Sequence, residues 1–450
     1  MTNKEKTAGG RRAQMLSGPI GITLLRFASP TLLGAIIQSF VGIVEGIAIG
    51  GLGIEALAGS ALIYPLVILT QMFSSGAIGG TTSGAMARAI GANDPKQMSQ
   101  VIHATLVIAI SNAILMGSIL LFIGPSLFSL LGGNGTVLKQ ALAYGDIFFV
   151  GMISMWLFNM IAGLFRGSGQ MFIPLLALGT VSVLHALICF PLVEEYGIRG
   201  AAMALVFAYS IGSILLITRL FQSSSGIKPD RHHGLPINFL LTLYKKGLMA
   251  ASNPVLTIST SLLITSFASQ LGLHVLAGYG IVVRLELVVM PITFGIGASL
   301  IAMVGANLGA DNRNRAISIA WTGSFIAAGI AASIGIFVGI YPDVWLPLFS
   351  PNDDVAEMAR LGLTIIAPCY GFMGLGLGLY FSSHGMGTIE WAVAGAVLRL
   401  IVIILGTLTL MMTDMFVPAS LFAVVALAIT IYGVMVALAL HLGPWQRKTL

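Results

Sequence analysis

The sequence is dominated by apolar stretches, each long enough to cross a lipid bilayer as a helix, which takes about 20 residues. Hydrophobic residues make up 57% of the chain and charged residues only 8%, whereas soluble proteins carry about a quarter charged residues. This composition excludes an ordinary soluble fold. The stretches predict twelve transmembrane helices, at residues 28–50, 56–86, 98–124, 137–165, 171–193, 199–221, 238–269, 275–305, 316–342, 356–383, 389–412 and 416–441.

The charged residues predict how these helices are oriented. Most lysines and arginines fall in one alternating set of connections, whereas the other set holds Lys139, Arg199 and Arg360 beside several acidic residues. Positive charge favours the cytoplasmic side, so we expect both termini to be cytoplasmic and the protein to lie in the cell (inner) membrane. The net charge of +6 then reflects topology and not nucleic-acid binding. We expect the first span, and not a cleaved signal peptide, to direct insertion.

The two halves of the chain repeat each other. The segment LGIEALAG at 52–59 returns as LGLHVLAG at 271–278, AIGANDPKQ at 89–97 as NLGADNRNR at 307–315, and LFRGSGQ at 164–170 as SSHGMGT at 382–388. Pro30 likewise corresponds to Pro254. Four landmarks in the same order indicate two parallel six-helix repeats about an axis along the membrane normal, with a site expected between them.

The fold class predicted is therefore an all-α polytopic membrane protein of two six-helix repeats. The expected parts are a cytoplasmic N-terminal segment (1–27), an N-lobe of helices 1–6 (28–221), a cytoplasmic linker (222–237), a C-lobe of helices 7–12 (238–441) and a cytoplasmic C-terminal tail (442–450). We expect this chain to act as a monomer in the lipid bilayer.

At these landmarks the sequence resembles the multidrug and toxic compound extrusion (MATE) family, over nearly the whole chain. The resemblance rests on SFVGIVEGIAIGGLGIEALAG around the end of the first helix, the loop AIGANDPKQ, LFRGSGQ closing the fourth helix and YGIRGAAMA opening the sixth. It implies a secondary exporter of small organic, often cationic and amphipathic, compounds, driven by inward flow of protons or sodium. It also implies two lobes around a central cavity that opens alternately to each side.

Departures from the family's pattern bear on the coupling ion. Members with a cation site in the first lobe carry an Asn and an Asp in the fifth helix, where this chain has Val181 and His185. A threonine usual in the sixth helix is Leu205 here, and carboxylates that other members carry in the seventh and tenth helices correspond to Leu262 and Met373. Most oxygen ligands expected for sodium are missing, so the resemblance favours proton coupling.

Glu45 is the first candidate for the coupling and substrate site. Family members often carry an acidic residue fifteen positions after a proline in the first helix, and Glu45 has that spacing from Pro30. Acidic residues inside a membrane usually face a bundle interior or a wet cavity, and a low dielectric favours the neutral acid. The alternative is a permanently protonated acid bonded to a neighbouring helix. Gln38, two turns earlier on the same face, could contact substrate or bridge helices.

His185 and Ser182, one turn apart on the fifth helix, are further candidates for this site. Histidine titrates between about pH 5 and 8, so His185 could exchange a proton with Glu45. The alternative is a histidine that serves only in packing. The pairing of His185 with Glu45 is a hypothesis that rests on the family alignment.

Hinge or closure roles are the expectation for Pro30, Arg284, Glu286 and Arg399. Arg284 and Glu286 lie two residues apart in the eighth helix and therefore point to different faces. Each needs a partner elsewhere, and Arg399 in the eleventh helix adds another charge within the membrane. Structural pairing or closure contacts are favoured over substrate binding.

Two other classes of function remain as alternatives. A lipid-linked saccharide flippase shares a related two-lobe architecture but needs cationic cavity residues, for which only Arg284 and Arg399 are available. A polytopic membrane enzyme would need a metal or His/Asp constellation, whereas His232 and His233 form the only local cluster. Cys189 and Cys369 fall inside apolar spans, which argues against a disulfide framework or a thiolate metal site. We expect no enzyme activity and no cofactor.

Overall fold

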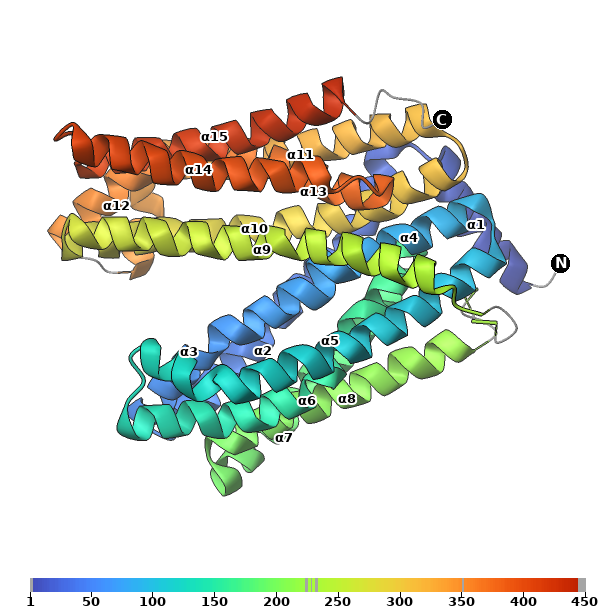
Figure 1. Ribbon diagram of the computed structural model, residues 1–450, viewed down its shortest axis with the longest axis horizontal. Coiled ribbons are helices and arrows are strands. Elements are labelled where there is room, and N and C mark those ends of the chain that lie inside the picture. The colour runs from blue at the N-terminus through green and yellow to red at the C-terminus, as the bar shows by residue number, and fades with distance from the viewer. Residues whose placement is uncertain (1–2, 223–225, 228, 231–233, 350–351, 444–450) are drawn as a thin grey trace. The chain divides into compact units, whose positions relative to one another are not determined.

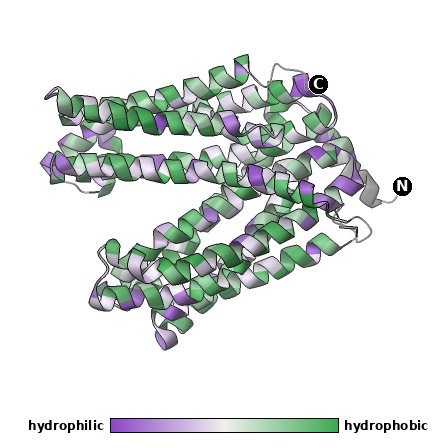
Figure 2. Cartoon of the chain, in the orientation of Figure 1, coloured by the Kyte–Doolittle hydropathy of each residue, from purple (hydrophilic) through white to green (hydrophobic). Residues whose placement is uncertain are grey.

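The computed structural model describes residues 3–222, 226–227, 229–230, 234–349 and 352–443 (Figure 1). Within these ranges, twelve helical segments are long and apolar enough to span a membrane, which agrees with the predicted number. Apolar residues predominate along the helices (Figure 2). Parts of the predicted linker and C-terminal tail lie outside the described residues.

The helices follow the same order in each half of the chain. The first half comprises α1 (Asn3–Ser17), α2 (Ile20–Gly50), α3 (Ile54–Gln71), the π-helical turn η1 (Met72–Ala77), α4 (Ile78–Ala92), α5 (Pro95–Leu130), α6 (Gly135–Gly167), α7 (Phe172–Tyr196) and α8 (Ile198–Phe221). The second comprises α9 (Ile237–Gln270), α10 (Leu273–Gly309), α11 (Arg313–Ile340), the 3₁₀ turns η3 (Pro342–Val344) and η4 (Leu346–Phe349), α12 (Asp353–Ile366), η5 (Ala367–Cys369), α13 (Tyr370–Met386), α14 (Glu390–Met412) and α15 (Pro418–Leu442).

Contacts between helices divide the chain into two compact units. Unit 1 is Met1–Gly18 with Ser29–Leu248, and unit 2 is Pro19–Ala28 with Met249–Leu450. In unit 1, α6 packs against α3, α4, α5 and α8, and in unit 2, α13 packs against α10, α11 and α15. Since α6 and α13 occupy corresponding places in the repeat, each unit is built around the same central helix.

The repeat extends to the backbone at the ends of the helices. Gly169 and Gly387 both have a φ of 76°, and Asn93 and Asp311 have φ of 55° and 58°. All four lie in the segments that the sequence matched between the halves. This left-handed region is open to glycine and tolerated by Asn and Asp. The sequence landmarks therefore mark helix ends with the same backbone conformation.

Most spans differ from the predicted ranges by a few residues, and three differ in where they begin or in their continuity. The first span begins at Ile20 and not at 28, because Arg26, which interrupts the apolar run, keeps its side chain exposed. The second span runs on to Ala92 and contains η1, which no local pattern indicated. The tenth, predicted as one helix over 356–383, is interrupted by η5, since Pro368 lacks an amide hydrogen and cannot continue the helical bonding.

Two contacts satisfy backbone carbonyls that the helices leave open. Arg12 on α1 donates from Nε to the carbonyl of Ile90 at 3.1 Å and from Nη2 to that of Gly91 at 2.7 Å. A cation at the C-terminal end of α4 also complements the helix dipole. In unit 2, Pro254 cannot bond to the carbonyl of Ala250, and the Tyr380 hydroxyl donates to that carbonyl at 3.3 Å.

Candidate functional site

A hydrogen-bonded carboxyl group lies inside unit 1. Glu45, on α2, is 9% exposed, and the hydroxyl of Tyr144 on α6 donates to its Oε1 at 2.5 Å. Tyr144 itself is 3% exposed. A buried carboxyl group is stable only with polar partners, so this phenol gives Glu45 a fixed neighbour on another helix.

Other polar groups of unit 1 surround the same position. Tyr64, on α3, has its hydroxyl 3.1 Å from the point that a Cβ on Gly42 would occupy, one turn before Glu45. Tyr64 on α3, Cys189 on α7 and Tyr209 on α8 all lie close enough to Glu45 to interact with its charge. Because these groups come from separate helices, the site exists only when the unit is folded.

Gln38 contributes to this cluster through Tyr209. The Tyr209 hydroxyl donates to Oε1 of Gln38 at 3.0 Å, and the Tyr209 ring stands edge-on to Phe158 at 5.2 Å between centroids. Gln38 therefore bridges α2 to α8, which was one of its two predicted roles. Glu45 and Gln38, two turns apart on α2, each accept a hydrogen bond from a buried tyrosine.

His185 and Ser182 are buried on α7 in the same unit, at 0% and 8% exposure. Within the part of the chain that the structure describes, neither ring nitrogen of His185 has a hydrogen-bond partner. The group that bonds to Glu45 is Tyr144 and not His185. The hypothetical pairing of His185 with Glu45 is therefore absent as a direct hydrogen bond in this conformation.

The charged candidates of unit 2 have different neighbours. The guanidinium of Arg284 lies 4.8 Å from the centre of the Phe349 ring, a cation–π contact. Glu286 is half-buried and interacts electrostatically with Arg399 on α14. Arg284 and Glu286 thus have separate neighbours. Pro30 lies inside α2, next to Ser29, where that helix enters unit 1.

The positions that depart from the family's pattern are mostly apolar and buried. Val181 and Leu205 in unit 1 are 0% and 4% exposed, and Met373 in unit 2 is 2% exposed, whereas Leu262 is 65% exposed. Val181 packs against Gly212 of α8. Among the described residues, no group of three or more His, Cys, Asp and Glu side chains could hold a metal ion.

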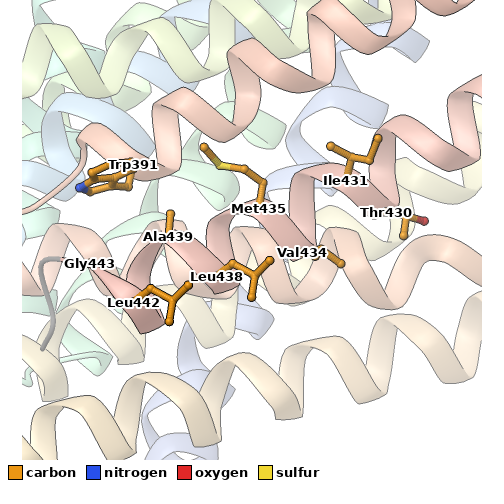
Figure 3. Close-up of a pocket in the computed structure, with 9 residues that line it drawn as sticks. All are labelled: Trp391, Thr430, Ile431, Val434, Met435, Leu438, Ala439, Leu442 and Gly443. Atoms are coloured by element: carbon orange, nitrogen blue, oxygen red, sulfur yellow. The ribbon is translucent and has the colours of Figure 1, made fainter.

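An apolar groove runs along α15 in unit 2, where Trp391 of α14 lies at one end (Figure 3). Its volume is about 800 Å³, and its lining includes Met435, Leu438 and Leu442, with Thr430 as the hydroxyl-bearing side chain. Because α14 and α15 are both long enough to span a membrane, such a lining is suited to hydrocarbon chains.

Sequence reasoning missed the tyrosines of this site. Tyr64, Tyr144 and Tyr209 are polar residues within apolar spans, and that is the signal by which they could have been found. Their contacts with α2 join residues 99 and 171 positions apart. No local periodicity carries that information.

The fold and these buried groups define a polytopic membrane protein with polar chemistry inside its helical units. The sequence model of the MatE family matches residues 30–190 and 250–409, one match in each half. The chain belongs to this family of multidrug and toxic compound transporters. It is accordingly a transporter and not an enzyme.

Relatives and solved structures agree with this assignment. An "FAD transporter" of Shewanella oneidensis is 25% identical over 378 residues, 81% of this chain and 82% of the relative. A "Probable multidrug resistance protein YoeA" of Bacillus subtilis is 25% identical over 382 residues, 81% of each chain. An outward-facing multidrug resistance MATE family transporter of the MOP superfamily has a TM-score of 0.85 at 19% identity, over 97% of this chain and 99% of that one. At that identity the structure supports the fold alone.

Proposed function

We propose that this protein is a secondary active exporter of organic, cationic compounds, driven by inward flow of protons. The observation that carries the proposal is a buried carboxyl group, Glu45, hydrogen-bonded to Tyr144 inside a membrane-spanning helix. An ionisable group at such a place is by default a candidate for an ion or substrate pathway. From the positive-inside rule we infer that both termini face the cytoplasm and that the protein lies in the inner membrane.

The mechanism follows from competition for one carboxylate. A cationic compound binds ionised Glu45, and protonation from the outer side neutralises the charge and releases the compound. The proton leaves to the cytoplasm when the site next opens there, and a new cation replaces it. Because proton and cation favour different charge states of the same group, their fluxes are coupled. Gln38, Ser182 and His185 are the proposed neighbours of the cation.

The energy available from one proton is sufficient for this cycle. A membrane potential of 100 mV supplies about 2.3 kcal/mol per charge, and one pH unit adds about 1.4 kcal/mol. Export of a monovalent cation costs about the same 2.3 kcal/mol against the potential, so a one-for-one exchange leaves the pH difference, which supports about a tenfold concentration gradient per pH unit. A single titrating carboxyl group is enough for a gradient of that size, without a second proton site.

Proton coupling is favoured over sodium coupling by the neighbours of Glu45. The polar groups around it are chiefly phenols. A phenol can donate a hydrogen bond to a carboxylate, and this arrangement is compatible with a carboxyl group that gains and loses a proton. Val181 and Leu205 are buried apolar residues where the family's cation sites carry oxygen ligands.

A lipid-linked saccharide flippase is the rival function. It would need exposed cationic groups for a pyrophosphate, and Arg284, which is exposed, has its guanidinium over the Phe349 ring. Arg399 is half-buried beside the charge of Glu286. These surroundings fit a structural or small-ligand role better than they fit a large phosphorylated headgroup.

Efflux from proteoliposomes tests the proposal. A fluorescent organic cation is loaded, and a proton gradient and a sodium gradient are imposed separately on wild type and on Glu45→Gln. We expect proton-driven efflux by wild type, at least tenfold faster than by Glu45→Gln, since the amide can neither ionise nor carry a proton.

The matched control is Asp146→Asn, which changes an exposed acid of α6 and should leave efflux unchanged. Efflux that follows only the sodium gradient would refute proton coupling. Normal proton-driven efflux by Glu45→Gln would refute the role of this carboxyl group. Movement of a lipid-linked saccharide without cation efflux would favour the flippase.

A further inference from the structure

A second polar site lies wholly within unit 2. It is a void of about 20 Å³ between α9, α10, α13, α14 and α15, and its polar lining consists of Asn253, Thr257, Thr260, Arg399 and Tyr432. A space of this size accommodates about one water molecule or one similarly small group. Five helices of one unit therefore enclose room for a single small ligand group.

Three polar atoms at this void have no hydrogen-bond partner among the described residues. Asn253 is 5% exposed and Tyr432 is 3% exposed, and no hydrogen bond satisfies Nδ2 of Asn253, the Tyr432 hydroxyl or Nε of Arg399 among the described residues. The Asn253 side chain and the Tyr432 hydroxyl lie close enough to interact with each other. Buried polar groups of native proteins are nearly always bonded, so three unsatisfied groups at one void indicate a missing ligand.

The packing holds the Tyr432 hydroxyl at this place. A Cβ on Gly376 of α13 would lie 2.3 Å from the Tyr432 ring, and one on Gly395 of α14 would lie 3.4 Å from it. The ring therefore passes between two glycines and cannot turn away without rearranging both helices. The glycine-rich run GLGLG at 374–378 thus makes room for a side chain of this site.

The chemistry of the unsatisfied groups identifies the class of ligand. The Nδ2 of Asn253 and the Nε of Arg399 are N–H donors, and the Tyr432 hydroxyl can donate. The Thr257 hydroxyl already donates to the Asn253 carbonyl at 2.9 Å. Convergent donors with one guanidinium would bind an acceptor that carries negative charge.

We propose that this void in unit 2 is a binding site for one small anionic group, either a halide ion or a carboxylate, held by Arg399, Asn253 and Tyr432. Glu286 is the competing negative charge, because it interacts with Arg399 from α10, although it does not line the void. This site is separate from the proposed function, because ligand binding there requires no proton gradient.

Thermal unfolding of the purified protein in nanodiscs tests the site. Chloride, bromide or formate replaces gluconate at constant sodium and constant ionic strength, because gluconate is too large for the void. A ligand that binds only the folded state raises the unfolding temperature with the logarithm of its concentration once this exceeds the dissociation constant. We expect such concentration-dependent stabilisation of wild type, relative to gluconate, by chloride and by formate.

Variants separate this site from a general salt effect. Arg399→Gln should weaken anion binding about tenfold to a hundredfold, as expected for loss of a charged hydrogen bond, and Tyr432→Phe should weaken it less. Glu286→Gln should strengthen binding, because it removes the competing charge. The matched control is Arg284→Gln, which removes an arginine of the same unit that does not line the void and should leave binding unchanged.

If the Arg399→Gln variant does not fold, the Asn253→Leu variant serves as the test instead. Stabilisation by halides alone assigns the site to a free inorganic anion, and stabilisation by formate as well extends it to the carboxylate of a transported molecule. Either result supports the site. The proposal is overturned if no anion stabilises wild type relative to gluconate, which would leave the void to water, or if Arg399→Gln and Asn253→Leu respond as wild type does. Neither result depends on the outcome of the efflux experiment.

Discussion

At the scale of single residues, the hydrogen bond from Tyr144 to Glu45 determines how this carboxyl group responds to pH. A phenol that donates to a carboxylate stabilises the ionised form, whereas burial favours the neutral acid. The two effects oppose each other at one atom, Oε1 of Glu45.

Removal of the Tyr144 hydroxyl should therefore shift the pH dependence of cation binding. A charged hydrogen bond contributes about 1.5 kcal/mol or more, so in Tyr144→Phe we expect half-maximal binding about one pH unit higher than in wild type. The sign follows because ionised Glu45 loses a donor and the neutral acid persists to higher pH. Binding of a fluorescent cation, titrated over pH, measures the shift.

Tyr209→Phe is the matched control for this shift. It removes a hydroxyl that donates to Gln38 and not to Glu45, so the midpoint should stay near that of wild type. Equal shifts in both variants would mean that the Tyr144 hydrogen bond has no particular influence on Glu45.

Sequence reasoning found the acid but not its partners. Glu45 is conspicuous because a charge in an apolar helix is rare, and its distance from Pro30 matches a family pattern. Tyr144, Tyr209 and Tyr432 are polar residues within apolar helices, but only the packing of distant helices shows which groups they contact. For the same reason, Arg399 was identified as a charge in the membrane, but the void beside it was not predicted.

At the scale of helices, the ends that repeat between the two halves are set by backbone conformation. Gly169 and Gly387 share a φ of 76° at segments whose sequences differ, LFRGSGQ and SSHGMGT. The repeat search found these glycines from sequence alone, whereas η1 and η5 interrupt helices that apolar periodicity predicted as continuous. Hydropathy indicates whether a segment lies in an apolar environment. It does not indicate whether each turn of that segment is α-helical.

Alanine at these helix ends should destabilise the protein. An L-residue in the left-handed region costs about 1–2 kcal/mol, so Gly169→Ala and Gly387→Ala should each lower stability by about that amount. The matched controls are Gly179→Ala and Gly280→Ala, which lie within α7 and α10 with open space around an added Cβ. There alanine should be neutral or stabilising.

Thermal unfolding in detergent measures the stability of both pairs of variants. A destabilisation confined to Gly169→Ala and Gly387→Ala would support the conformational explanation. Equal losses at all four positions would mean that any added methyl group disturbs these helices, and the argument from φ would fail.

At the scale of the whole molecule, charge predicts topology. Lys96 and Lys139 are both exposed and lie at the starts of α5 and α6, so one membrane span separates them. The positive-inside rule assigns Lys96 to the cytoplasm and Lys139 to the outside. This topology is inferred from the distribution of charged residues, and it can be tested without any transport assay.

Cysteine labelling in intact cells provides that test. In a background of Cys189→Ala and Cys369→Ala, we expect Lys139→Cys to react with a membrane-impermeant maleimide. Lys96→Cys should react only after the membrane is permeabilised. The reverse pattern would invert the proposed topology and place both termini outside.

The shared conformation of Asn93 and Asp311 has a consequence for protein engineering. Because the chain turns in the same way at both positions, the connector 89–97 could be exchanged for 307–315 without redirecting the helices that it joins. The interiors could not be exchanged in this way, since one unit contains a buried acid among phenols and the other an arginine among unsatisfied donors. A chimera made from two copies of the first half should therefore assemble at its connectors while lacking the anion site proposed for the second half.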